Sequence, residues 1–194
     1  MQKIMFNDQY GLTQAVLEGR KTQTRRIAYQ KPFKYNCNCG FYTEGKDKGK
    51  FAINDGNEIV AKSHYKIGEV VAVAQSYSHI PYAEETFNEE VASAGWGNKM
   101  FVKASLMPHQ IKITNIRCER LQDISTDDCM KEGIFCSHIE GIDDAFSYDA
   151  TNDSFEKKWW YRTPIEAYKM LSCKLHLHWG INPLVFVYDF VLIR

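Results

Sequence analysis

The sequence predicts an α+β domain, in which a small mixed β-barrel carries peripheral helices and long insertions. The segments Val70–Ala74, Ile111–Arg120 and Val185–Ile193 are rich in β-branched and aromatic residues, which favour strands. Each is too apolar to leave a face in water, so we expect all three in one closed or nearly closed barrel. The 194 residues contain no internal repeat and no linker-like stretch, so 1–194 is predicted to form a single domain.

The N-terminal elements are predicted from their apolar spacing and end signals. Lys3–Phe6 is an apolar stretch compatible with a first strand. A helix follows, for which Asn7 or Asp8 is the expected N-cap and Gly19 the expected C-terminal stop. Lys21–Ile27 contains two threonines and an isoleucine, which favour an extended conformation.

Three polar stretches with little periodicity are predicted to be insertions: 30–66, 79–98 and 135–163. The first contains a predicted hairpin, with strands at 51–53 and 59–61 and a turn at 54–57. The second leads to Met100–Ala104, which is expected to be short and extended. The third is polar and aromatic and is predicted to be a loop.

The C-terminal half contains the clearest local signals. Apolar residues alternate in 111–120, placing Ile111 and Ile113 on one face and Ile116 on the other. Ser125, followed three residues later by an acidic residue, predicts the start of a short helix that Gly133 ends. A second helix begins at Pro164. Its predicted inner side consists of Ile165, Tyr168, Leu171, Leu175 and His176.

Composition excludes several classes of protein. The formal net charge is zero, which argues against a protein that coats nucleic acid through charge alone. Met1–Tyr10 has no basic region followed by an apolar core, and no apolar run reaches the roughly 18 residues of a membrane span. We therefore expect a cytoplasmic protein without a membrane partner.

The six cysteines follow no framework spacing, so reduced thiols are expected. Cys37 and Cys39 are the only close pair, and no second pair lies at a zinc-site distance. His176 and His178 are two apart, so they are expected to be polar surface residues rather than metal ligands. No metal and no cofactor is predicted.

Gly19–Arg26 is the most informative stretch of the chain. Its sequence, GRKTQTRR, contains four cations and no acid: Arg20, Lys21, Arg25 and Arg26. A local cationic cluster in a neutral protein predicts an anionic or strongly polar ligand. The alternative interpretation is a solvated basic strand edge.

The order of these motifs resembles the ASCH domain, a member of the PUA-like superfamily, and most closely the larger bacterial and prophage-encoded members. The resemblance is carried by GRKTQTRR, by the turn and strand at 68–71, by 113–117 leading into 119–125, by 128–134, and by Asn182-Pro183 before the last strand. It implies a PUA-like barrel with a pocket for RNA, a nucleotide or a modified nucleoside.

Some small ASCH proteins are amidohydrolases that remove the acetyl group from N4-acetylcytidine. The resemblance places their lysine and threonine at Lys21 and Thr24, and their glutamate at Glu132. The chemistry is coherent, because a threonine hydroxyl becomes a nucleophile when an adjacent base takes its proton. A lysine with a lowered pKa can be that base, and a carboxylate can orient it or move the proton onward.

Two objections leave the assignment open. Lys21 and Thr24 are three residues apart, so a regular strand would point them to opposite faces, and Thr22 is the alternative hydroxyl. A glutamate in the last turn of a short helix is usually solvated, which is the alternative for Glu132.

The competing function is a non-catalytic module that binds RNA or a nucleotide. Its expected ligand-binding residues are Arg20, Thr22, Arg25, Arg26 and Arg117. The stretch 157–162 interleaves cations with aromatic residues, a composition that binds single-stranded nucleic acid or that pins a long loop to the barrel.

Overall fold

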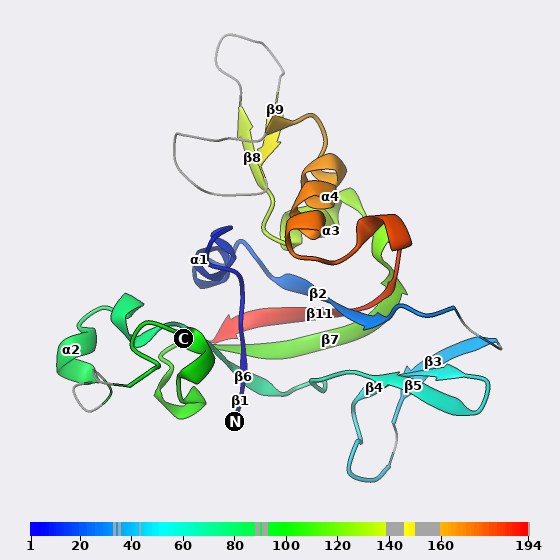
Figure 1. The fold of residues 1–194 in the computed structure, drawn as a ribbon, viewed down its shortest axis with the longest axis horizontal. Coiled ribbons are helices and arrows are strands. Elements are labelled where there is room, and N and C mark those ends of the chain that lie inside the picture. The colour runs from blue at the N-terminus through cyan, green and yellow to red at the C-terminus, as the bar shows by residue number, and fades with distance from the viewer. Residues whose placement is uncertain are drawn as a thin grey trace.

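The computed structural model describes residues 1–32, 34, 36–42, 44–87, 90, 93–138, 146–149 and 160–193. Its centre is a five-stranded mixed sheet with the strand order β1-β6-β7-β11-β2 (Figure 1). These strands are β1 (Gln2–Ile4), β6 (Val70–Val73), β7 (Gln110–Arg120), β11 (Leu184–Ile193) and β2 (Gln23–Tyr29). Only the β1–β6 pairing is parallel.

The α+β class is confirmed, and the three apolar segments predicted as strands are neighbours in this sheet as β6, β7 and β11. Within the described residues, no strand pairing joins the β1 edge to the β2 edge. Closure of the sheet into a PUA-like barrel therefore remains a prediction.

A β-bulge corrects the predicted alternation of β7. Asp189 pairs with Asn115 but Phe190 pairs with Ile113, so Thr114 is an extra residue on the β7 side. The extra residue reverses the alternation that follows it. Ile116 is therefore buried in the same core as Ile113, rather than on the opposite face.

Helix α1 (Leu12–Leu17) does not begin as predicted. Its N-cap is Gly11, in the left-handed conformation and without a side-chain cap, so neither Asn7 nor Asp8 has that role. Asp8 instead accepts a hydrogen bond of 2.5 Å from the Thr13 hydroxyl. The predicted stop is confirmed, because Gly19 has φ +76°, which glycine adopts without strain.

The two later helices begin where the capping patterns predict. Ser125 caps α3 (Thr126–Lys131) by accepting a hydrogen bond from the Asp128 backbone. Thr163 forms a capping box with Glu166 at the start of α4 (Pro164–Lys174). These two helices pack against each other at one end of the sheet (Figure 1).

The inner side of α4 differs from the prediction at its two ends. Tyr168 and Leu171 are buried in the core, but Ile165 is 39% exposed. His176 lies beyond the helix and has φ +56°, so it is not on the helical face at all.

The insertions contain more regular structure than predicted. The expected hairpin is present as β4 (Phe51–Asp55) and β5 (Glu58–Lys62), and β3 (Cys37–Phe41) adds a third strand to it. Residues 135–163 were predicted to be a loop. Their described part forms an antiparallel sheet of β8 (Phe135–His138), β9 (Phe146–Asp149) and β10 (Trp160–Tyr161).

The second insertion contains the short helix α2 (Ala83–Thr86). The prediction of an extended 100–104 segment is wrong, because Lys99–Phe101 and Ala104–Leu106 are 3₁₀ turns. They cover a small apolar cluster separate from the main core. Tyr77, Phe87, Val102 and Met107 are among its members.

The N-cap of α3 is a direct test of how firmly this short helix is held. We expect Ser125→Ala to lower the free energy of unfolding by about 1 kcal/mol, because the Asp128 backbone N–H loses its acceptor. Ser125→Asp should retain most of the stability, since aspartate is also a good cap. Chemical denaturation measures both, and equal stability of the alanine variant and the wild type would contradict this account.

Candidate functional site

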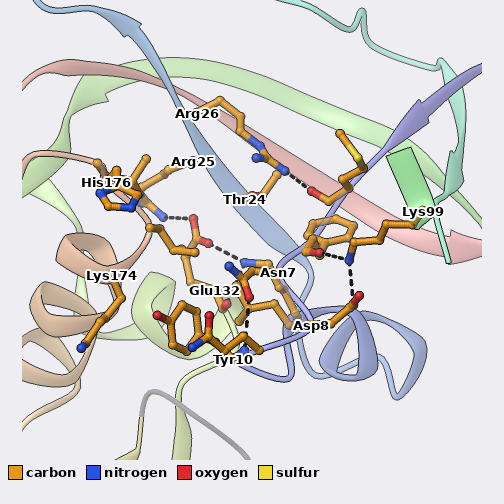
Figure 2. A pocket seen from close by; sticks show the side chains of 17 residues that line it. Asn7, Asp8, Tyr10, Thr24, Arg25, Arg26, Lys99, Glu132, Lys174 and His176 are labelled. Carbon is orange, nitrogen blue, oxygen red and sulfur yellow. Dashed lines mark hydrogen bonds and ion pairs between the residues drawn. The ribbon is translucent and has the colours of Figure 1, made fainter. Parts of the chain in front are cut away.

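A cavity of about 580 Å³ lies where the N-terminal segment, the start of β2 and the ends of α3 and α4 meet (Figure 2). Its lining contains five cationic side chains, Lys21, Arg25, Arg26, Lys99 and Lys174, and two carboxylates, Asp8 and Glu132. The cavity is therefore cationic, although the whole chain is neutral.

The structure brings together the three residues that the resemblance places in a catalytic site. Lys21, Thr24 and Glu132 all line the cavity, and all three are buried. The Lys21 Nζ donates to the Glu132 carboxylate Oε2 over 2.6 Å and to the Glu132 backbone oxygen over 2.7 Å. The alternative of a solvated Glu132 is excluded, since its side chain is only 4% exposed.

The chain around Gly19 explains how Lys21 and Thr24 share one cavity. β2 begins only at Gln23, so Lys21 lies in the irregular junction before the strand. There its backbone N–H bonds to the Ala15 oxygen, while the next N–H bonds to the Lys131 oxygen of α3. The alternation rule for strands therefore does not apply between Lys21 and Thr24.

Burial lowers the pKa of Lys21, and the neighbouring cations Arg26 and Arg25 lower it further. The Glu132 carboxylate acts in the opposite direction without cancelling these effects. Desolvation disfavours the charged form of an ammonium group, so the neutral amine is more accessible here than on a surface lysine.

Arg25 holds the other side of the Glu132 carboxylate. Its Nη1 donates to Glu132 Oε1 over 3.0 Å and to Gln23 over 2.5 Å. Nε and Nη2 donate to Glu119, and Nη2 also donates to Asp128 over 3.1 Å. The five N–H groups of the guanidinium thus make five hydrogen bonds inside the protein.

Arg25 was expected to contact the ligand, but its bonds make it a positioning residue for Glu132. Its guanidinium is fully buried and lies 5.8 Å from the centre of the Tyr168 ring. Such a network leaves the carboxylate facing the cavity in a fixed orientation (Figure 2).

Arg117 and Thr22, two further expected ligand contacts, do not line this cavity. They lie in a second cavity of about 540 Å³ together with Lys131. There Arg117 pairs with Glu119, Asp128 and Asp189. Thr22 is therefore not positioned as an alternative to Thr24.

Of the two remaining arginines, one lies at the cavity and one does not. Arg20 pairs with Glu18 over 2.7 Å and lies beside the Phe135 ring, outside the cavity lining. Arg26 lines the cavity, where its Nη2 donates to the Met5 oxygen over 2.6 Å.

Several residues that line the cavity were not among the predicted site residues. Lys99, directly after the second insertion, pairs with Asp8 over 2.7 Å and also bonds to the Phe6 oxygen. Tyr10 also lines the cavity, and His176 lies on the side away from Lys99 (Figure 2). No sequence signal links Lys99 to Asp8 across 91 positions, and His176 was expected to be a polar surface residue rather than part of a cavity.

Other predicted features stay apart from this cavity. The Sγ atoms of Cys37 and Cys39 are 3.9 Å apart, and in the described part of the chain no three acidic, histidine or cysteine side chains form a metal-binding group. Of the aromatic stretch 157–162, residues 157–159 lie outside the described residues. Among the helices that the structure describes, none has the length and apolarity to cross a bilayer.

Comparisons with protein-family models, with curated proteins and with solved structures found no match to this chain.

The pKa shift of Lys21 predicts a pH dependence of stability. Between its lowered folded-state pKa and the ordinary lysine pKa of 10.5, the unfolded chain binds more protons at Lys21 than the folded one. The contribution of Lys21 to the free energy of unfolding should therefore rise with pH in this window.

Urea denaturation of the wild type and of Lys21→Met at pH 7, 8 and 9 measures this contribution. We expect the wild type to gain stability relative to the variant as the pH rises. Lys169→Met is the matched control, since Lys169 is exposed on α4. Parallel profiles of the wild type and Lys21→Met would show that Lys21 keeps an ordinary pKa.

Proposed function

We propose that this protein is an ASCH-type amidohydrolase of the PUA-like superfamily that acts on the exocyclic amide of an N4-acylated cytidine. The observation that carries the proposal is the buried Lys21–Glu132 pair at the floor of a cationic cavity that Thr24 also lines. The mixed sheet of five strands supports the PUA-like part of the proposal, which further requires closure of its edges.

In the proposed reaction, Thr24 Oγ attacks the acyl carbon and its proton moves to the neutral amine of Lys21. The bond between the acyl carbon and N4 then breaks, and Lys21 returns the proton to N4, which leaves as the amino group of cytidine. Water next attacks the Thr24 ester, giving up one proton through Lys21 to Thr24 Oγ. The products are cytidine and the carboxylic acid.

The surroundings of Lys21 support its role as the base. A neutral amine has two N–H groups, and the structure provides two acceptors, both on Glu132. The lone pair of Lys21 then remains for the Thr24 hydroxyl. Arg25, by its bond to the other carboxylate oxygen, holds Glu132 in place while the proton moves.

A second function is favoured by the exposed cation at the cavity. Arg26 has its guanidinium on the cavity wall and forms no carboxylate pair among the described residues. A PUA-like module that only binds RNA or a nucleotide would use Arg26 to contact the phosphate of its ligand. Turnover distinguishes the two functions.

The enzymatic proposal predicts that the purified protein releases acetate from N4-acetylcytidine. Thr24→Ala and Lys21→Ala should each lower kcat by at least about 1,000-fold, since a nucleophile and its base act as a unit. Lys21→Arg keeps a cation at the site but cannot be deprotonated near neutral pH, so it should be equally inactive. Liquid chromatography of the cytidine product measures the rate.

Three controls make this result decisive. The matched substitution Lys131→Arg lies outside the cavity and should be fully active. Circular dichroism and the thermal unfolding midpoint show whether each variant folds. Full activity of Lys21→Arg would exclude lysine as the base, and an inactive wild type would leave the binding module as the better proposal.

Both functions predict a role for Arg26. Arg26→Gln should weaken the binding of a cytidine nucleotide about tenfold and reduce the salt dependence of binding, because one contact to an anion is lost. Arg162→Gln, an exposed arginine outside the cavity, is the matched control. An unchanged salt dependence in Arg26→Gln would place the ligand elsewhere.

A further inference from the structure

The end of α4 forms a wall of the cavity that the proposed reaction does not use. Lys174 is the last residue of the helix, and His176 follows two positions later. The His176 N–H bonds to the Cys173 oxygen over 3.1 Å, and the Leu177 N–H bonds to the Ser172 oxygen over 2.9 Å. These two bonds form a Schellman motif, in which His176 occupies the position that glycine normally takes.

His176 is unusual in this position. Its φ of +56° lies in the left-handed region, where a residue with a Cβ is strained. The side chain is exposed and lines the cavity, so burial in the core does not explain a histidine here. His178 and Asn182 have the same backbone conformation away from the cavity, so it is the combination of this conformation with a place in the cavity lining that sets His176 apart.

The ion pairs within the cavity also indicate the end of α4 as the place where an anionic ligand binds. Lys21 is paired with Glu132, Arg25 is fully occupied within the protein, and Lys99 is paired with Asp8. Arg26 and Lys174 form no ion pair with any described residue, and of these two Arg26 already donates to the Met5 oxygen. Lys174 and the exposed His176 line the same cavity from the end of α4, and an ammonium and an imidazole are donors that bind a phosphate group.

We propose that the substrate is a nucleotide, with a phosphomonoester that Lys174 and His176 hold while the acylated base reaches Thr24. The proposal rests on the proposed function for the position of the base. The cavity, at about 580 Å³, has the size of sites for ligands larger than a base alone. A mononucleotide fits better than RNA, because the cations are gathered in one cavity of a chain with no net charge.

The C-terminal end of a helix ordinarily repels an anion, because its last carbonyl groups carry partial negative charge. Here two of those carbonyls, on Ser172 and Cys173, already accept the hydrogen bonds of the Schellman motif. The ammonium group of Lys174 adds a full positive charge at the same end. The wall therefore presents donors rather than bare carbonyl oxygens.

Calorimetric titration in a Thr24→Ala background tests the proposal, since binding is then measured without turnover. Cytidine 5′-monophosphate should bind about tenfold more tightly than cytidine, which corresponds to 1.4 kcal/mol. In Lys174→Gln and in His176→Asn, the ratio of the affinity for cytidine 5′-monophosphate to that for cytidine should fall toward one. Asparagine also tolerates the left-handed conformation, so the backbone of the second variant is preserved.

The matched controls are Lys169→Gln, on the exposed side of the same helix, and His178→Asn, whose φ of +55° is nearly that of His176. Neither residue lines the cavity, so both controls should keep the tenfold ratio. Equal affinities for cytidine and its monophosphate in the Thr24→Ala protein would overturn the proposal. Tighter binding of a cytidine-containing RNA oligonucleotide than of the mononucleotide would also overturn it.

A thermal measurement separates a ligand role from a structural one. His176→Gly and His178→Gly should both raise the unfolding midpoint by about 2 °C, because both relieve the same backbone strain. Only His176→Gly should also lose the preference for the monophosphate. A lower midpoint in His176→Gly would show that the histidine is kept for stability, and would overturn its assignment to the ligand.

This binding test of the phosphate site does not depend on whether the protein hydrolyses an acylated cytidine. A tenfold monophosphate ratio that depends on Lys174 and His176 supports the phosphate site, even when no acylated cytidine is hydrolysed. Conversely, hydrolysis of N4-acetylcytidine together with a ratio of one overturns the phosphate site and leaves the amidohydrolase proposal standing.

Discussion

The buried carboxylate of Glu132 is the interaction on which the site depends. Removing an ionised carboxylate from water is strongly unfavourable unless charged and hydrogen-bonded partners replace the water. Lys21 supplies one partner and Arg25 the other, one on each carboxylate oxygen. Because Lys21 lies before β2, Arg25 lies within it and Glu132 ends α3, this one group ties the helix-to-strand junction to the end of α3.

The same network explains why the sequence contains so many charges near β2 and yet leaves few of them free. Arg25 and Arg117 share Glu119 and Asp128, and Gln23 bridges Asp128 and Asp189. Arg20, Arg25 and Arg117 are therefore held by carboxylates of the protein. The total charge of a basic sequence cluster does not show which cations a ligand can reach: Arg26 has no carboxylate partner among the described residues, whereas Lys21 lines the cavity within an ion pair.

Local signals in the sequence predicted most of the helix ends. They did not predict features of the structure that depend on contacts between residues far apart in the sequence. Ser125, Gly19 and Pro164 mark helix ends through contacts within a few positions, and these predictions are confirmed. The bulge at Thr114 depends on how β11 pairs with β7, and no pattern within 111–120 contains that information. Likewise, Lys21 and Glu132 are 111 positions apart; their pairing was expected only through the resemblance, not from spacing.

The segment directly after the second insertion helps to shape the cavity. Lys99 follows that insertion and holds the N-terminal segment through Asp8 and the Phe6 oxygen, while Lys3 donates to the oxygens of Met100 and Val102. The N-terminal wall of the cavity is thus fixed by residues 99–102. The buried Lys21–Glu132 pair carries the proposed chemistry, and the 99–102 segment sets the shape of the cavity beside it, so this segment bears on which ligand fits rather than on the proposed reaction.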